Sequence, residues 1–183
     1  MAAVTPKGKD STKGLIAVFT GNGKGKTTAA LGLAFRALGH EHRACIIQFI
    51  KGSWKYGELE AATRFKPLLD FHVMGRGFTW KSDDLEKDKA AAREAWEFAA
   101  QTIRENRHEL VILDELTYLS HYQIIDEEAI LAVLRDKPAA MHIAITGRYA
   151  SEALIQLADL VTEMREIKHP FQDGIKAQKG IEF

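Results

Sequence analysis

The sequence lacks several features that would restrict its class. It has one cysteine, which excludes an internal disulfide framework and fits a reducing compartment. Its 25 lysines and arginines equal its 25 aspartates and glutamates, so there is no net charge to favour nucleic acid or an acidic membrane. No apolar run reaches the roughly 20 residues that span a bilayer, and the polar start MAAVTPKGKDSTKG has no signal-peptide core. We therefore expect a cytoplasmic protein that binds neither nucleic acid nor membrane.

Several catalytic signatures are also missing. The seven histidines show no metal-ligand spacing, since there is neither an H-E-x-x-H motif nor a Cys/His cluster. There is no G-x-S-x-G motif of a serine hydrolase either. The single cysteine, Cys45, lies in the apolar run ACIIQFI, which favours a buried structural thiol over a reactive one.

Four short apolar runs are present instead, and each is nearly continuous, as in strands covered by helices on both faces. They are LIAVFT (15–20), ACIIQFI (44–50), LVILDE (110–115) and HIAITG (142–147), with weaker candidates at 71–74 and 160–164. A chain of 183 residues with 46% hydrophobic content is expected to form one domain, 1–183. Residues 1–13 are expected to be a flexible arm, and 168–183 a polar C-terminal tail.

Helical patterns separate these runs. Residues 26–38 contain good helix formers, and Gly39 follows as a stop signal. Ser82 is predicted to cap a second helix that extends to about Asn106. Its apolar face is predicted to contain Leu85, Ala92, Trp96, Ala99 and Ile103. Asp126 and Ser151 are predicted to cap two shorter helices. This alternation predicts an α/β fold, with a mostly parallel sheet and helices on both faces.

A glycine-rich loop joins the first predicted strand to the first helix. It differs from the Walker A pattern G-x-x-x-x-G-K-[ST] because Thr20 stands at the position of the first glycine. The context still predicts a phosphate-binding loop, since glycines allow backbone N–H groups to turn inward and the helix N-terminus favours an anion. Lys26 is expected to reach a phosphate, and the Thr27 hydroxyl to ligate Mg²⁺. The predicted nucleotide-binding residues are Gly21, Asn22, Gly23, Lys24, Gly25, Lys26, Thr27 and Thr28.

Two acids end a predicted strand in VILDE. Ligands of parallel sheets bind beyond the carboxyl ends of the strands, so Asp114 and Glu115 are candidate Mg²⁺ ligands there. The alternative is a carboxylate that only caps a neighbouring segment. In an ATPase, Glu115 would instead activate water. These two motifs by themselves leave a simple ATPase or a small-molecule kinase open.

Two further features have two interpretations each. Phe78 and Trp80 in GRGFTW either bind a ligand or anchor their loop on the core. Arg148, in TGR after a predicted strand, either meets a phosphate in the same crevice or is an ordinary surface arginine.

Taken together, six segments resemble the P-loop family of ATP:cob(I)alamin (corrinoid) adenosyltransferases. The segments are TGNGKGKTTAALG, QFIKG, GRGFTW, LDELTY, TGR and GIKAQKGIEF, in this order from about Gly14 to Phe183. The resemblance implies a RecA-like P-loop fold, a homodimer, and transfer of the 5′-deoxyadenosyl group of ATP to Co(I) of a reduced corrinoid with release of triphosphate. It also implies that the loop holds the triphosphate in the opposite sense to hydrolytic P-loop enzymes.

The resemblance assigns roles to individual residues. Lys26, the loop amides and Mg²⁺ (for which Mn²⁺ can substitute) on Thr27 and Glu115 would stabilise the leaving triphosphate. Phe78 and Trp80 would lie against the lower face of the corrin and exclude the lower axial ligand of Co(II). That change raises the reduction potential, so a reduced flavoprotein can deliver the electron.

Two expectations concern the ends of the chain. Family members often carry a longer N-terminal extension over the active site, so a shortened or absent cover is expected here. The tail is expected to pack near the nucleotide or the dimer interface. The rival functions are a RecA-like ATPase or small-molecule kinase, and a nucleotide-binding regulatory module.

Overall fold

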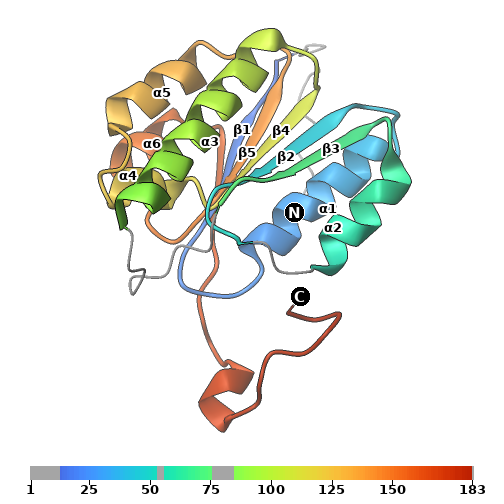
Figure 1. Ribbon diagram of the computed structural model, residues 1–183, viewed down its shortest axis with the longest axis vertical. Helices are drawn as coiled ribbons and strands as arrows, with labels where there is room; N and C mark the ends of the chain where they lie inside the picture. Colours follow the sequence, from blue (N-terminus) through green and yellow to red (C-terminus); the bar gives the residue numbers. More distant parts are fainter. Residues whose placement is uncertain (1–12, 53–55, 76–84, 183) are drawn as a thin grey trace, which may run out of the picture.

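The computed structural model describes residues 13–52, 56–75 and 85–182. Six strands form one sheet in the order β3-β2-β4-β5-β1-β6, and all adjacent strands are parallel (Figure 1). The strands are β1 (Ile16–Thr20), β2 (Ala44–Gln48), β3 (Leu69–Val73), β4 (Leu110–Asp114), β5 (His142–Thr146) and β6 (Leu160–Glu163). All six lie where the sequence predicts them, to within two residues at each end.

Helices cover both faces of the sheet (Figure 1). Helices α1 (Lys26–Leu38) and α2 (Gly57–Ala62) lie on one face. The other face carries α3 (Leu85–Glu105), α4 (Thr117–His121), α5 (Glu127–Arg135) and α6 (Glu152–Leu157). The predicted α/β class with a parallel sheet is therefore confirmed. None of the helices in the described ranges combines the length and apolarity needed to cross a membrane.

The predicted helix signals are largely correct. The side chain of Asp126 accepts a hydrogen bond from Glu128 N (3.3 Å), and that of Ser151 accepts one from Leu154 N (3.1 Å). Helix α1 ends before Gly39, as expected. Ser82 lies outside the described residues. Helices α2 and α4 were not predicted, because six- and five-residue helices carry too little periodicity to be recognised and depend on tertiary packing.

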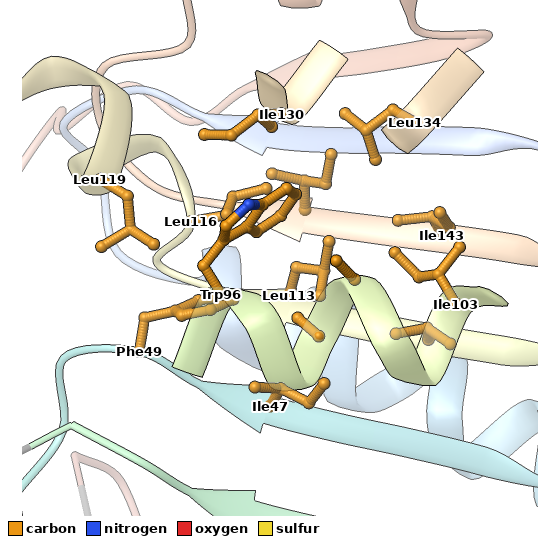
Figure 2. Close-up of a cluster of buried hydrophobic side chains, with 14 of the residues drawn as sticks. Ile47, Phe49, Trp96, Ile103, Leu113, Leu116, Leu119, Ile130, Leu134 and Ile143 are labelled. Atoms are coloured by element: carbon orange, nitrogen blue, oxygen red, sulfur yellow. The ribbon is translucent and has the colours of Figure 1, made fainter. Parts of the chain in front are cut away.

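The larger core lies between the sheet and α3, α5 and α6 (Figure 2). Trp96 on α3 is 4% exposed and packs with Phe49, Leu113 and Leu116. The predicted apolar face of α3 is confirmed for Ala92, Trp96, Ala99 and Ile103, which are all buried. Cys45 is buried too, and burial raises the pKa of its thiol to about 12, in agreement with a structural role.

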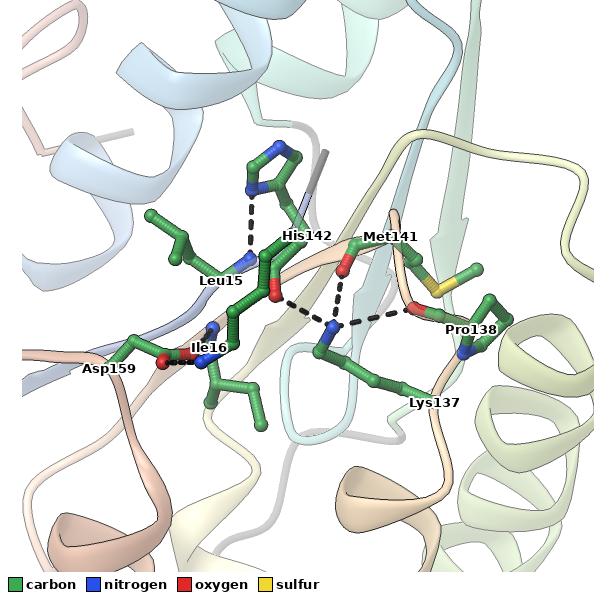
Figure 3. Close-up of polar contacts among 9 residues, drawn as sticks. Leu15, Ile16, Lys137, Pro138, Met141, His142 and Asp159 are labelled. Atoms are coloured by element: carbon green, nitrogen blue, oxygen red, sulfur yellow. Dashed lines mark hydrogen bonds and ion pairs between the residues drawn. The ribbon is translucent and has the colours of Figure 1, made fainter. Parts of the chain in front are cut away.

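Polar contacts fix the starts of β1 and β5, at the edge of the sheet opposite the glycine-rich loop (Figure 3). Lys137 Nζ donates to Gly14 O and Met141 O, both at 2.8 Å. The Leu15 N–H donates to His142 Nδ1 at 3.1 Å. Two of these bonds, Lys137 to Gly14 and Leu15 to His142, join residues more than 120 positions apart in the chain. They set the register of β1 against β5, and this register fixes where the loop after β1 begins.

The C-terminal tail leaves the sheet after β6 and extends away from the body before its end turns back (Figure 1). Its one helical turn is a 3₁₀ helix, Pro170–Asp173, and Phe171 is exposed. Near its end, Glu182 accepts a hydrogen bond from Lys24 Nζ of the glycine-rich loop at 2.7 Å.

Candidate functional site

The glycine-rich loop connects β1 to α1 at the carboxyl edge of the sheet. Gly21 and Gly25 have φ values of 95° and 115°, in the left-handed region that glycine adopts without strain. The loop also packs closely on the chain that follows β6, where Gly23 N donates to Met164 O at 2.7 Å. A Cβ on Gly21 would lie 2.4 Å from Met164 O, and a Cβ on Gly23 would lie 2.7 Å from backbone atoms of Arg165. The fold therefore requires these glycines, whatever the loop binds.

Thr20 explains the departure from the Walker A pattern. Its side chain is 8% exposed, and its Oγ1 donates to Arg148 O at 3.1 Å. The same oxygen accepts a long hydrogen bond from Ala150 N at 3.4 Å. A glycine at this position would remove both bonds. Thr20 thus ties the end of β1 to the backbone that carries Arg148.

Lys26 is the first residue of α1, and its side chain folds back onto the glycine-rich loop. Its Nζ donates to Gly21 O at 2.8 Å and to Gly23 O at 2.7 Å. Burial, followed by the nearby charge of Arg148, lowers the pKa of Lys26. The ammonium group therefore lies within the loop and next to the N-terminus of α1, where an anion is favoured.

Asp114 connects four elements at the end of β4. Its side chain is completely buried. Its Oδ1 accepts hydrogen bonds from Thr27 Oγ1 (2.8 Å) and Thr146 Oγ1 (2.7 Å), and its Oδ2 accepts one from Gln48 Nε2 (2.9 Å). The sequence analysis assigned no role to Gln48 or Thr146. The available signal was their position, because each is a polar residue that ends an otherwise apolar strand.

Glu115 follows in an unusual backbone conformation. Its φ of 66° is left-handed, which is uncommon for a residue with a side chain and is concentrated at functional sites. Its N–H donates to Thr146 Oγ1 at 2.8 Å. Burial and then the charge of Asp114 raise the pKa of Glu115 to about 7, against the opposing charges of Lys51, Lys26 and Arg148. The half-buried Glu115 thus follows Asp114 directly and feels the charges of three cations.

Arg148 follows β5 and Gly147 at the same edge of the sheet. It lines a polar pocket of about 560 Å³ together with Asn22 of the loop. The other lining residues are Glu163, Arg165 and Glu166. The pocket brings two predicted site residues from separate motifs together.

Of the remaining residues predicted for the site, some are placed by the structure and some are not. Thr28 is exposed in the first turn of α1, and Lys24 is paired with Glu182. Phe78 and Trp80 lie outside the described residues, so their placement stays a prediction. Within residues 13–52, 56–75 and 85–182, no group of three or more His, Cys, Asp or Glu side chains is arranged to hold a metal. A site with one threonine and two carboxylates instead suits Mg²⁺, which is commonly held by one or two carboxylates plus substrate phosphates.

A family model and the similar proteins identified by sequence agree on one family. The family description "ATP:corrinoid adenosyltransferase BtuR/CobO/CobP" matches residues 12–183. A corrinoid adenosyltransferase of Sinorhizobium sp. is 46% identical over 177 residues, which cover 96% of this chain and 83% of that protein. Corrinoid adenosyltransferases of Pseudomonas aeruginosa and Escherichia coli are 44% and 43% identical, and each alignment covers 93% of this chain. In those two proteins the alignments cover 84% and 86% of the length.

A solved structure shares the fold. The cytoplasmic domain of EssC matches with a TM-score of 0.50 and 17% sequence identity. The match covers 91% of this chain but only 34% of the other one. At this identity the likeness concerns the α/β architecture alone.

Proposed function

The chain belongs to the ATP:corrinoid adenosyltransferase family, and from this premise we propose how its residues transfer the adenosyl group of ATP to a corrinoid. The observation that carries the proposal is the joint placement of three residues at one edge of the sheet: Thr27 donates a hydrogen bond to Asp114, and Lys26, next to Thr27, donates to the carbonyl groups of the glycine-rich loop. This edge is where ligands of parallel α/β sheets bind.

The reaction needs no proton removal. The electron pair of Co(I) attacks carbon 5′ of ATP, and the bond between that carbon and the α-phosphate oxygen breaks. Triphosphate leaves with the bonding electrons, and the cobalt, now bonded to carbon, becomes formally Co(III). Because Co(I) is itself a strong nucleophile, the protein has to supply alignment and stabilisation of the leaving group.

Lys26 and the loop supply that stabilisation in our proposal. The Lys26 ammonium would exchange its contacts with Gly21 O and Gly23 O for phosphate oxygens. Arg148 would contact the triphosphate from the pocket that it shares with Asn22. The loop would hold ATP in the sense opposite to hydrolysis, with carbon 5′ toward the corrinoid.

Mg²⁺ would be held by Thr27 and Glu115. Asp114 already accepts three hydrogen bonds, so it fits better as the group that orients Thr27 and bonds the metal through water. Bound Mg²⁺ would neutralise part of the triphosphate charge. The hard oxygen donors of these residues fit this ion.

Phe78 and Trp80 would pack on the lower face of the corrin and keep Co(II) four-coordinate. This would raise the reduction potential, and about 59 mV in a one-electron couple changes the equilibrium tenfold. A reduced flavoprotein would then supply the electron that forms Co(I). We also propose that the protein acts in the cytoplasm, as a homodimer.

One observation favours a second candidate function. The pKa of Glu115, raised to about 7, would suit a general base that activates water in an ATPase. Anaerobic incubation with ATP, Mg²⁺ and chemically reduced cobalamin separates the two functions. The transferase should change the visible spectrum of the corrinoid and release triphosphate only when corrinoid and reductant are present. Formation of ADP without corrinoid would instead support the ATPase.

Lys26→Ala provides the matched control for this assay. Removal of a preorganised charge donor typically costs about 10²–10³ in rate. We expect that loss in transfer with an unchanged far-ultraviolet circular dichroism spectrum. Lys26 is partly exposed, and its side-chain hydrogen bonds within the described ranges all go to its own loop. Near-normal transfer by a folded Lys26→Ala protein would contradict the assignment.

A further inference from the structure

A second lysine lies at the same edge of the sheet, outside the glycine-rich loop. Lys51 follows the end of β2 by three residues, and its Nζ is 3.9 Å from Asp114 Oδ2. Its side chain is 22% exposed. Because β2 pairs with β4, the loop after β2 approaches the end of β4. The sheet topology thus brings Lys51 beside the nucleotide crevice.

Two neighbours hold the Lys51 ammonium in place. Its Nζ donates to Glu58 Oε1 at 3.0 Å, in the first turn of α2. The same atom lies 4.9 Å from the centre of the Tyr56 ring, within the range of a cation–π contact. Burial by itself lowers the pKa of Lys51, but Asp114 and Glu58 raise it on balance, so the group is charged at neutral pH.

Asp114 does not need Lys51 as a hydrogen-bond donor. Three other side chains already satisfy its carboxylate, and 3.9 Å is too long for a hydrogen bond. The charge of Lys51 acts on the next residue as well. Among the cations that lower the pKa of Glu115, Lys51 has the largest effect, ahead of Lys26 and Arg148. Lys51 therefore faces the carboxylates that surround the phosphate site.

The charge balance of the crevice calls for such a cation. Asp114 and Glu115 repel a triphosphate. Lys26, Arg148 and the proposed Mg²⁺ offset these two carboxylates and only part of the triphosphate charge. The triphosphate gains a further negative charge when the bond to carbon 5′ breaks. A preorganised cation beside that charge stabilises the transition state more than the ground state.

We propose that Lys51 is a second triphosphate-binding cation, which leaves Glu58 to contact phosphate oxygens of ATP and of the released triphosphate. This inference rests on the proposed function, because it assigns Lys51 to the same site. The competing role is structural, in which the Lys51–Glu58 ion pair only fixes the segment before α2. The two roles differ in what happens when Glu58 is changed.

Binding of inorganic triphosphate with Mg²⁺, measured by titration calorimetry, tests the proposal without the corrinoid. Lys51→Met should weaken binding by about tenfold or more, the usual effect of losing a charged hydrogen bond. Lys51→Arg should restore binding to within about threefold, since it keeps the charge. Glu58→Gln should bind triphosphate as tightly as the unaltered protein or more tightly, because Lys51 is released. Urea unfolding of each variant controls for loss of structure.

Two results would overturn the proposal. Wild-type affinity in a folded Lys51→Met protein would remove Lys51 from the site. Equal losses of affinity and stability in Lys51→Met and Glu58→Gln would show a structural ion pair. The corrinoid assay is independent of both results. A protein that binds triphosphate through Lys51 but forms no adenosylcorrinoid would refute the proposed function and leave the inference standing.

Discussion

Some side chains at the carboxyl edge of the sheet have structural roles that their motifs did not predict. Asp114 belongs to a Walker B-like run, yet its three hydrogen bonds make it the residue that positions Thr27. Gln48 Oε1 is buried without a hydrogen-bond partner among the described residues. An unpaired buried acceptor costs about 1–3 kcal/mol. In native structures such a group is commonly completed by a bound water or ion.

Thr20 gives the sharpest prediction at the scale of the residue. If the Walker A glycine were simply missing, Thr20→Gly should be neutral or beneficial. We expect the opposite, because the bonds from Oγ1 to Arg148 O and from Ala150 N are lost. The free energy of unfolding should fall by about 1–2 kcal/mol, and adenosyl transfer should fall with it. Urea denaturation and the corrinoid assay measure the two effects.

Thr20→Ser is the matched control, since it keeps the hydroxyl. It should retain most of the stability and the activity. Thr20→Gly protein that equals the wild type in both measurements would show that the bond to Arg148 O has no role.

At the scale of the element, the turn after β5 depends on one glycine. Gly147 has a φ of 146°, and a Cβ there would lie 1.9 Å from Thr117 Oγ1 of α4. Gly147→Ala should therefore lower the free energy of unfolding by about 2–4 kcal/mol. Gly32 in α1 offers a control, because a Cβ there meets no atom within 4 Å. Gly32→Ala should raise the free energy by about 0.5–1 kcal/mol. Urea denaturation of both variants checks the contrast, and a stabilising Gly147→Ala would contradict it.

A second prediction at this scale concerns how β1 is attached to β5. Burial, with the charges of Lys137 and His42, lowers the pKa of His142, and its Nδ1 accepts from Leu15 N only when unprotonated. The unfolded state then binds a proton more readily than the folded state. The contribution of His142 to stability is present above its ordinary pKa near 6.5 and is lost as the pH falls through its lower folded value.

His142→Gln should reduce that pH dependence, because the amide oxygen of glutamine can accept from Leu15 N without titrating. Urea midpoints between pH 5 and 8 should fall less steeply toward acid in the variant than in the wild type. Identical slopes in the two proteins would show that His142 does not contribute.

At the scale of the whole molecule, one part of the sheet is not covered by any helix of the described residues. On the α1 face, Leu15 and Leu160 are 42% and 45% exposed, and they line an apolar groove of about 490 Å³. All four residues of the edge strand β6 are exposed. Exposed edges and apolar patches of this kind usually mark interfaces. If the proposed homodimer forms, we predict that the second copy covers this face.

Leu160→Lys tests that assignment by sedimentation equilibrium. The wild type should be a dimer, and the variant should dissociate at least tenfold more readily, because a charge would be buried at the contact. Phe35→Lys is the control, since Phe35 is 70% exposed and contacts Phe65 edge to face near α2. A monomeric wild type, or equal dissociation in both variants, would contradict the assignment.

The sequence by itself determined the strands, the longer helices and the position of the glycine-rich loop. Four nearly continuous apolar runs and two weaker candidates place the six strands, and the glycine-rich loop between a strand and a helix predicts a nucleotide site. These features were readable because they depend on near neighbours in the chain: side-chain periodicity, caps such as Asp126, and the backbone freedom of glycine. The order of six motifs also indicated the family.

The tertiary structure alone decided which side chains meet. Thr20 bonds to Arg148 across 128 residues, and Asp114 bonds to Gln48 across 66 and to Thr146 across 32. The pairing of β2 with β4 brings Lys51 to Asp114. Nothing local in the sequence encodes these contacts, because they arise from the strand order β3-β2-β4-β5-β1-β6, which places distant strand ends side by side. The short helices α2 and α4 escaped prediction for the same reason, since packing rather than local pattern stabilises them.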